Sequence, residues 1–200
     1  MGRPRAFNET AVLDAAAAEF RVHGFAETST EQLCDAAGML RGSLYNAFTS
    51  KEELFIRALQ HYATKFRELQ AEILTDTTLT GAERLRTVMN VILQEERDAH
   101  EHGHGAGCMV VQSMMAPDLR DRDPRVTQIL EQDLRARLGL LEEAIRAGHA
   151  DGSVPGCVTP DEGALLFVTV TNGIRTMGQA GTDPDQLTQT AFAGTATLFT

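Results

Sequence analysis

Apolar residues recur every three or four positions along most of this chain, which is the spacing of amphipathic helices. No segment shows the alternation of apolar and polar residues that marks a half-buried strand. The stripes and the helix-capping signals together predict an all-α protein of about nine helices. We expect these helices over residues 8–23, between 29 and 38, over 41–47, 51–74, 108–116 and 124–147, and after Thr80, Thr159 and Asp183.

Capping signals mark several of the predicted helix ends. Ser29 and Ser50 are followed three residues later by Gln32 and Glu53, the arrangement of a capping box, in which two side chains satisfy each other's free backbone N–H groups. Glycine after an apolar stripe favours a helix end. On this basis Gly148 is expected to end the helix over 124–147.

The stretch from residue 29 to residue 51 contains two short predicted helices joined by a tight turn. Gly38 can adopt the positive φ angle that ends the first helix without a Cβ clash. Leu44 and Phe48 are spaced to point back toward the core. Two short helices joined in this way indicate a helix-turn-helix, whose second helix enters the major groove of DNA.

The surface of the second short helix also suits DNA. Arg41 and Lys51 are basic, and no acidic residue lies between Gly38 and Lys51. Tyrosine hydroxyls often bond phosphate oxygens, and the first turn of the following helix offers free N–H groups that favour phosphate. The predicted DNA contacts are therefore Arg41, Gly42, Ser43, Tyr45, Asn46 and Lys51.

Motifs in this region resemble the DNA-binding domain of the TetR (tetracycline-repressor-like) family. Three residues depart from the family pattern: Thr30 replaces an apolar residue, Cys34 an alanine, and Leu40 the serine or threonine that often caps the recognition helix. Leu40 leaves the start of that helix open. The resemblance rests on Gly24-Phe25, Thr28-Ser29, Ala36-Ala37-Gly38, Gly42-Ser43-Leu44-Tyr45, Phe48 and Ser50-Lys51-Glu52-Glu53-Leu54.

The resemblance implies a ligand-responsive transcriptional regulator, most often a repressor. Residues 1–50 would form the helix-turn-helix domain, with Thr28 among its DNA contacts, and residues 51–200 a helical domain for ligand binding and dimerisation. The partners implied are a near-palindromic double-stranded operator, a small effector and a second copy of the chain. The last two predicted helices are apolar and contain small residues, so we expect the homodimer to form through them.

An effector pocket is implied among the middle helices of the second domain. Methionines adapt to varied apolar ligands, which favours a small apolar effector, although plain core packing explains the same residues. The candidate lining residues are Phe66, Met89, Met109, Met114 and Phe167.

A glycine-rich segment near residue 104 carries side chains of metal-binding or reactive type. His100, His102, His104 and Cys108 are ligand types for zinc, nickel or copper, but their spacing matches no closed metal site. A thiol at the start of a helix also favours the reactive thiolate, which makes Cys108 a candidate sensor. Packing against the core and a polar connector remain the alternative readings, and no metal is predicted.

Charge and composition limit the remaining classes. The net charge is −10, yet residues 1–67 contain eight basic and eight acidic side chains, so the excess acid lies outside the predicted DNA-binding region. Arg3 and Arg5 form a short basic segment, which is either a flexible arm that touches DNA or a frayed terminus. Three cysteines, including Cys34 in the predicted core and Cys157 in a loop, suit a reducing cytoplasm.

Other functions have weaker support. No apolar run approaches membrane-spanning length, so we expect no membrane contact. No P-loop, dinucleotide motif or His-Glu-x-x-His pair is present, and we expect neither an enzyme nor a cofactor. The remaining alternative is a helical ligand-binding protein that does not bind an operator.

Overall fold

The computed structural model describes residues 8–103 and 107–199, which fold into ten α-helices and one short 3-10 helix without a strand. The predicted all-α class is therefore confirmed, with one helix more than expected. The predicted arm residues Arg3 and Arg5, and His104, lie outside the described part. The helices are α1 (Glu9–Glu27), α2 (Thr30–Ala37), α3 (Arg41–Phe48), α4 (Lys51–Leu74), α5 (Gly81–Glu101), α6 (Met109–Met114), α7 (Pro117–Arg122), α8 (Pro124–Asp151), α9 (Pro160–Gln179), α10 (Pro184–Gly194) and the 3-10 helix η1 (Ala196–Leu198).

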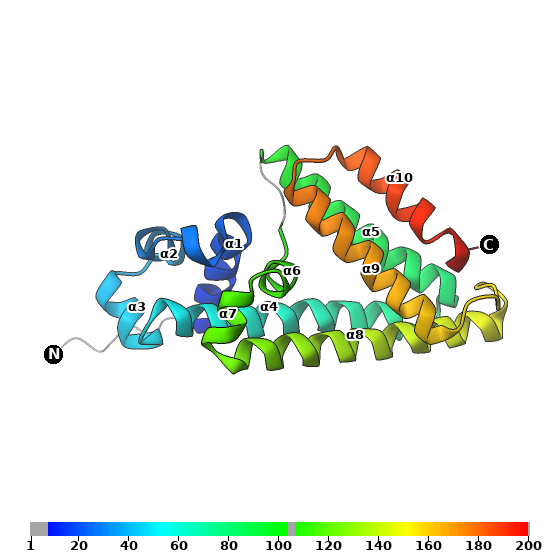
Figure 1. Ribbon diagram of the computed structural model, residues 1–200, viewed down its shortest axis with the longest axis horizontal. Helices are drawn as coiled ribbons and strands as arrows, with labels where there is room; N and C mark the ends of the chain where they lie inside the picture. The colour runs from blue at the N-terminus through cyan, green and yellow to red at the C-terminus, as the bar shows by residue number, and fades with distance from the viewer. Residues whose placement is uncertain (1–7, 104–106, 200) are drawn as a thin grey trace.

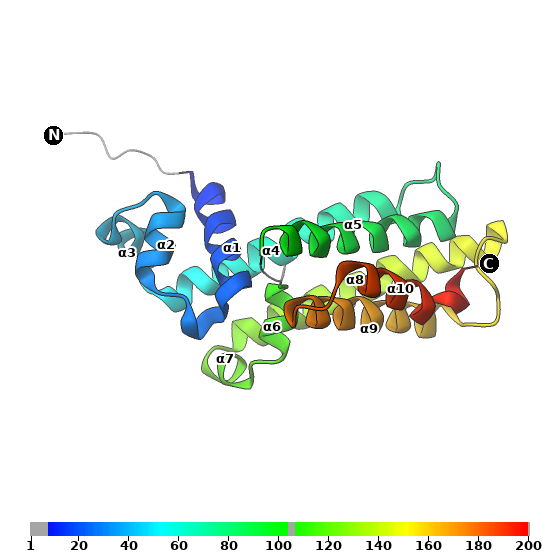
Figure 2. The ribbon, with the colours of Figure 1, turned by 90° about the horizontal axis from the view of Figure 1, so that it is seen from above.

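The helices divide into a head at one end and a longer body (Figure 1). Helices α1, α2 and α3 form the head, and α4 runs from it along the full body beside α8. Helices α5, α9 and α10 cover the other side of the body, as the view from above also shows (Figure 2). Helix α4 therefore joins the head to the body without a break.

Two hydrophobic clusters fill the interior. The first packs the head together with the start of α4, α6 and the start of α8. The second packs the end of α4 with α5, α8, α9 and α10. The clusters thus divide part-way along α4, whereas the predicted domain boundary at residue 50 stays a prediction.

Helix α1 is fastened to α4 by polar contacts as well as by apolar packing. Asp14 accepts hydrogen bonds from Lys65 at 2.9 Å and from His61 at 3.0 Å, and Arg57 pairs with Glu9. These contacts hold the head against the first half of α4.

Two expectations about the chain after residue 108 were wrong. Helix α7 begins with a proline at its first position but buries no side chain, so it has no apolar stripe to reveal it. Gly148 lies inside α8, which ends instead at Gly152 with a φ of 77°. A Cβ on Gly148 would come 2.3 Å from a methyl group of Val154, so this glycine permits close packing and does not cap the helix.

The expected capping box at Ser50 forms only in part. The Ser50 hydroxyl accepts the backbone N–H of Glu53 at 3.1 Å. The Glu53 carboxylate turns instead to Arg125 of α8, at 2.9 Å. Glu53 therefore ties the start of α4 to α8.

In the described part of the chain, no helix combines the length and the apolar character needed to cross a membrane.

Candidate nucleic-acid interface and effector site

Helix α3 buries one side in the head and presents the other to solvent. Leu44 and Phe48 are buried in the head cluster, as their spacing predicts. Gly42, Ser43 and Asn46, all predicted DNA contacts, are exposed on the opposite side, and Arg41, a fourth, is exposed as the first residue of the helix. The exposed face is polar, contains no acidic group and can lie against DNA.

Tyr45 connects α3 to α2. Its hydroxyl shares a hydrogen bond of 3.0 Å with the hydroxyl of Thr30. The guanidinium of Arg41 lies 5.7 Å from the centroid of the Tyr45 ring, within the range of a cation–π contact. Tyr45 is half-buried, so it contacts Arg41 with its ring and connects α2 to α3 through its hydroxyl.

Lys51 and Thr28 are placed differently from the exposed group. The Lys51 ammonium lies 4.6 Å from the Phe25 ring centroid and donates a hydrogen bond of 3.4 Å to the carbonyl oxygen of Ala26. Thr28 is only 1% exposed, and its hydroxyl donates to the Gly24 carbonyl oxygen at 2.5 Å. In this geometry Thr28 secures the turn before α2, whereas Lys51 remains near the head surface.

Leu40 is a prominent surface residue that the predicted contacts did not include. It precedes α3 without capping it by a side-chain hydrogen bond, and α3 begins at Arg41. Its side chain is 80% exposed, although it is large and apolar. An apolar group at this place suits the methyl group of a thymine in the major groove. The sequence already marked Leu40 as unusual, because it stands where a serine or threonine often caps the helix.

The five predicted effector residues are not brought together at one site. Met109 and Met114 pack in the cluster shared with the head. Phe66, Met89 and Phe167 belong to the cluster at the far end of the body. Met89, Met109 and Phe167 are almost fully buried, so plain core packing accounts for them here. Phe66 lines a cavity of about 550 Å³ between α1, α4 and α5.

Cys108 and the histidines do not form a metal centre in the described residues, where no group of three suitable ligands occurs. Cys108 is the residue before α6 and is buried, and its side chain does not cap that helix. The ring of His102 is within 2.6 Å of the Asp98 carbonyl oxygen. Cys34 is buried and Cys157 is exposed, as expected.

An ionic network, buried at Arg175 and Glu96 and partly exposed at Glu95 and Arg21, connects the head to α5 and α9. Arg175 of α9 contacts Glu95 at 2.5 Å and Glu96 at 2.9 Å, and Arg21 of α1 lies 3.8 Å from the same Glu95 oxygen. Burial alone would lower the pKa of Arg175, but Glu95 and other negative groups raise it above its usual value. Burial raises the pKa of Glu96, and the charge of Arg175 opposes that rise. The network couples the position of α1 to that of α9.

The outer faces of α9 and α10 have almost no charge. From residue 163 to the end of α9, Arg175 is the single charged residue, and it is buried. Leu165 and Met177 are exposed on α9. A Cβ on Gly194 would lie 3.1 Å from Val170, so α10 packs closely on α9. The exposed carboxylates of the two helices lie in their first turns, at Asp161 and Glu162 of α9 and at Asp185 of α10.

Comparisons with known proteins cover nearly the whole chain. Residues 12–58 match the family model described as bacterial regulatory proteins, tetR family, and residues 81–193 match the model described as tetracyclin repressor-like, C-terminal domain. The HTH-type transcriptional repressor BdcR of Escherichia coli (strain K12) is 30% identical over 196 residues, which are 98% of this chain and 91% of that protein.

Solved structures show the same arrangement of helices. A cysteine mutant of the TetR family transcriptional regulator CifR, in a complex with 26 bp of double-strand operator DNA, is 25% identical with a TM-score of 0.73 and covers 97% of this chain and 98% of that one. A TetR family regulator from Agrobacterium tumefaciens has a TM-score of 0.82 at 18% identity, over 96% of this chain and 97% of its own. The head lies within the part of the chain that aligns with both structures.

Proposed function

Because the chain belongs to the tetR family of bacterial regulatory proteins, we propose that it represses transcription by binding a near-palindromic operator as a homodimer. A small molecule bound beside the head releases it from the DNA. Two heads related by a two-fold axis would enter successive major grooves about one helical turn apart. Its operator is bacterial DNA, so the protein works in the cytoplasm.

The exposed face of α3 carries this proposal. Ser43 and Asn46 are exposed on the side of α3 opposite the buried Leu44 and Phe48, and Arg41 is exposed at the first position of the helix. Arginine can donate two hydrogen bonds to guanine, and we expect Tyr45 and Lys51 to contact phosphates. The acidic excess lies in the body, away from this face.

Operator binding tests the proposal directly. The DNA upstream of the protein's own coding region is titrated with parent protein and with Arg41→Ala in a fluorescence-anisotropy assay. Loss of a base contact costs about 1–3 kcal/mol of binding free energy and relaxes specificity. Lys51→Ala should weaken binding to all DNA sequences alike. It should also reduce the slope of log affinity against log salt concentration by about one.

Arg146→Ala is the matched control, because Arg146 lies near the far end of α8 and pairs with Glu142 and Glu143. It should bind the operator like the parent. Parent-like binding by both Arg41→Ala and Lys51→Ala would contradict the placement of α3 on DNA.

The kind of effector and the sensing chemistry are separate questions. The alternatives of a thiol sensor at Cys108 and of a metal sensor at the histidines stay predictions. The burial of Cys108 favours a reversible ligand over direct thiol modification, because a buried thiol is poorly accessible to reagents.

A further inference from the structure

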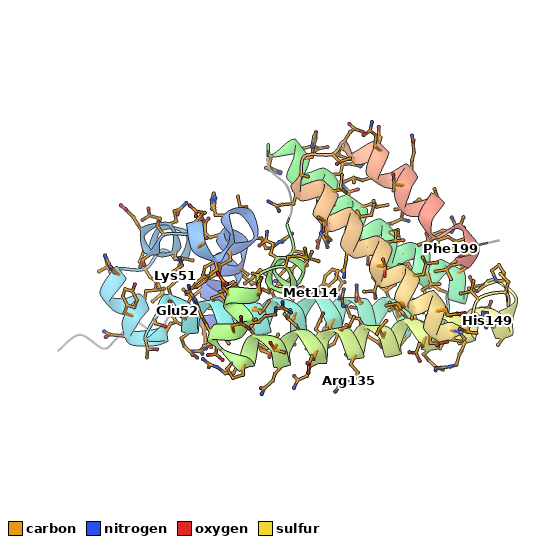
Figure 3. The ribbon with its side chains drawn as sticks, viewed as in Figure 1. Lys51, Glu52, Met114, Arg135, His149 and Phe199 are labelled. Atoms are coloured by element: carbon orange, nitrogen blue, oxygen red, sulfur yellow. The ribbon has the colours of Figure 1, made fainter. Side chains whose placement is uncertain are left out.

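A cavity of about 550 Å³ lies where the head meets the body. The end of α1 and the start of α4 form one wall, and α6 and α7 form the other. Figure 3 shows Lys51 and Glu52 at the start of α4, on the side of the molecule where α7 lies. We call this space the junction cavity. Its volume lies in the usual range for small-molecule sites.

The wall of the junction cavity is mainly apolar and contains one polar atom without a hydrogen-bond partner. Phe25, Phe55 and Leu119 supply much of the apolar surface. Ser113 of α6 also lines it, is 1% exposed, and has a hydroxyl without a hydrogen-bond partner. A buried hydroxyl that lacks a partner is costly, and an oxygen atom of a ligand in this cavity would supply the missing partner.

The charged residues at the mouth are of both signs. Lys51 and Arg122 are basic, and Glu52 and Asp118 are acidic. This balance gives no net preference for an anion or a cation. Together with two phenylalanine rings in the wall, it favours a neutral aromatic ligand that carries one hydroxyl or carbonyl oxygen.

We propose that the junction cavity binds a small neutral aromatic molecule whose oxygen hydrogen-bonds to Ser113, and that this molecule is the releasing effector. The regulatory part rests on the function proposed above. The cavity is formed jointly by the head and by α6 and α7, so its occupant has a different affinity for each head orientation, which is what a ligand needs to shift the equilibrium. It also contacts Lys51, a candidate phosphate ligand.

Binding is tested with 2-naphthol and its isosteric apolar analogue 2-methylnaphthalene. The chain contains no tryptophan, so naphthol fluorescence is measured against a low protein background. We expect one 2-naphthol per protomer with a Kd below about 1 mM, and binding of 2-methylnaphthalene weaker by about fivefold because it forms no hydrogen bond. Absence of 2-naphthol binding would overturn the proposal.

Ser113→Ala separates a ligand contact from a structural role. If the Ser113 hydroxyl has no hydrogen-bond partner in the free protein, its removal should raise Tm by about 2–4 °C. The variant should also bind 2-naphthol about fivefold more weakly than the parent does. A lower Tm together with unchanged 2-naphthol affinity would show that the hydroxyl is already satisfied, for example by an ordered water, and would overturn the proposal.

A bulky substitution in the junction cavity tests whether 2-naphthol binds there. Ala116→Phe places a ring in the junction cavity and should abolish 2-naphthol binding. Thr64→Phe is the matched control, because Thr64 lines a different cavity of about 560 Å³ between α1, α4 and α8. Equal loss in both variants, or loss only in the control, would place the probe elsewhere.

Operator release is measured separately from probe binding. Saturating 2-naphthol should lower operator affinity of the parent by at least about fivefold and leave Ala116→Phe on the DNA. Probe binding without any change in operator affinity would overturn the regulatory part alone. A parent protein that binds no operator even without probe would refute the proposed function, while the fluorescence titrations would still decide whether the cavity binds the aromatic ligand.

Discussion

Gly42 lies in the first turn of α3, and no atom lies within 4 Å of the position that a Cβ would occupy. Alanine therefore fits in the free protein and should raise the free energy of unfolding by about 0.5–1 kcal/mol, because glycine is a poor helix former. On DNA, the methyl group would separate α3 from the bases. We expect Gly42→Ala to have a higher Tm and an operator affinity lower by about tenfold.

Gly139→Ala provides the control for this experiment. Gly139 is exposed on α8 and has equally open space at its Cβ position. Its variant should gain similar stability with parent-like operator binding, measured by thermal melting and anisotropy. Parent-like operator binding by Gly42→Ala as well would mean that α3 does not approach the DNA closely at this residue.

The burial or exposure of a single residue was predictable where its position in the helical period or in a loop decides it. Leu44 and Phe48 follow the helical period and are buried, and Cys157 follows a helix end and is exposed. The burial of Thr28 was not predictable, because its hydroxyl bonds to Gly24 only after α1 has turned at that glycine. Met114 shows a related limit: its type favours an apolar environment but does not say which of two clusters provides it.

At the scale of helices, the sequence predicts those elements that bury a stripe. Helix α4 begins and ends where its caps and stripe place it. Helix α7 buries no side chain, so periodicity gives no sign of it. Gly148 shows that a glycine has two uses, since close packing of Val154 against α8 demands the same residue that a helix end favours. Only the tertiary contact distinguishes the two.

The attachment of α1 to α4 should depend on pH through Asp14. Partial burial alone would raise the pKa of Asp14, but the hydrogen bonds from Lys65 and His61 outweigh it and lower the pKa below its usual value of 3.8. A lowered pKa in the folded state stabilises the protein above pH 3.8, and this stabilisation is lost as the pH falls through the folded-state pKa. We therefore expect Asp14→Asn to lose stability at pH 7 and to match the parent near the acid limit of folding.

Denaturant unfolding at several pH values measures this difference. The side chain of Asp14 is 43% exposed, so solvent screening limits the expected loss at pH 7 to about 0.5 kcal/mol. Asp121→Asn makes the same chemical change at an exposed position of α7 and should show a smaller pH-dependent difference. A loss for Asp14→Asn that persists unchanged at low pH would contradict the ionic explanation.

At the scale of the molecule, the head and the body are joined in two ways. Helix α4 is covalently continuous from the head to the far end of the body. The ionic contacts from Arg21 through Glu95 to Arg175 form a second connection, which ends on α9. A change in the position of α9 relative to a partner subunit can therefore reach α1 without passing along α4. We therefore propose that the outer surface of α9 and α10 has a mechanical role as well as a structural one.

That surface should be the homodimer interface. Leu165 is 56% exposed on α9, so in the proposed dimer a carboxylate at this position would be buried without a partner. We expect the parent to be a dimer at micromolar concentration by light scattering and Leu165→Glu to be a monomer. Each monomer offers one head, so operator binding should weaken sharply because the linked second half-site contact is lost.

Met115→Glu is the matched control, since Met115 is 77% exposed but lies between α6 and α7, outside the proposed interface. It should remain dimeric and bind the operator as the parent does. Thermal melting of both variants distinguishes loss of assembly from loss of folding. Dimeric Leu165→Glu, or a monomeric parent that still binds the full operator tightly, would move the interface away from α9 and α10 and would remove the mechanical role of the Arg175 connection.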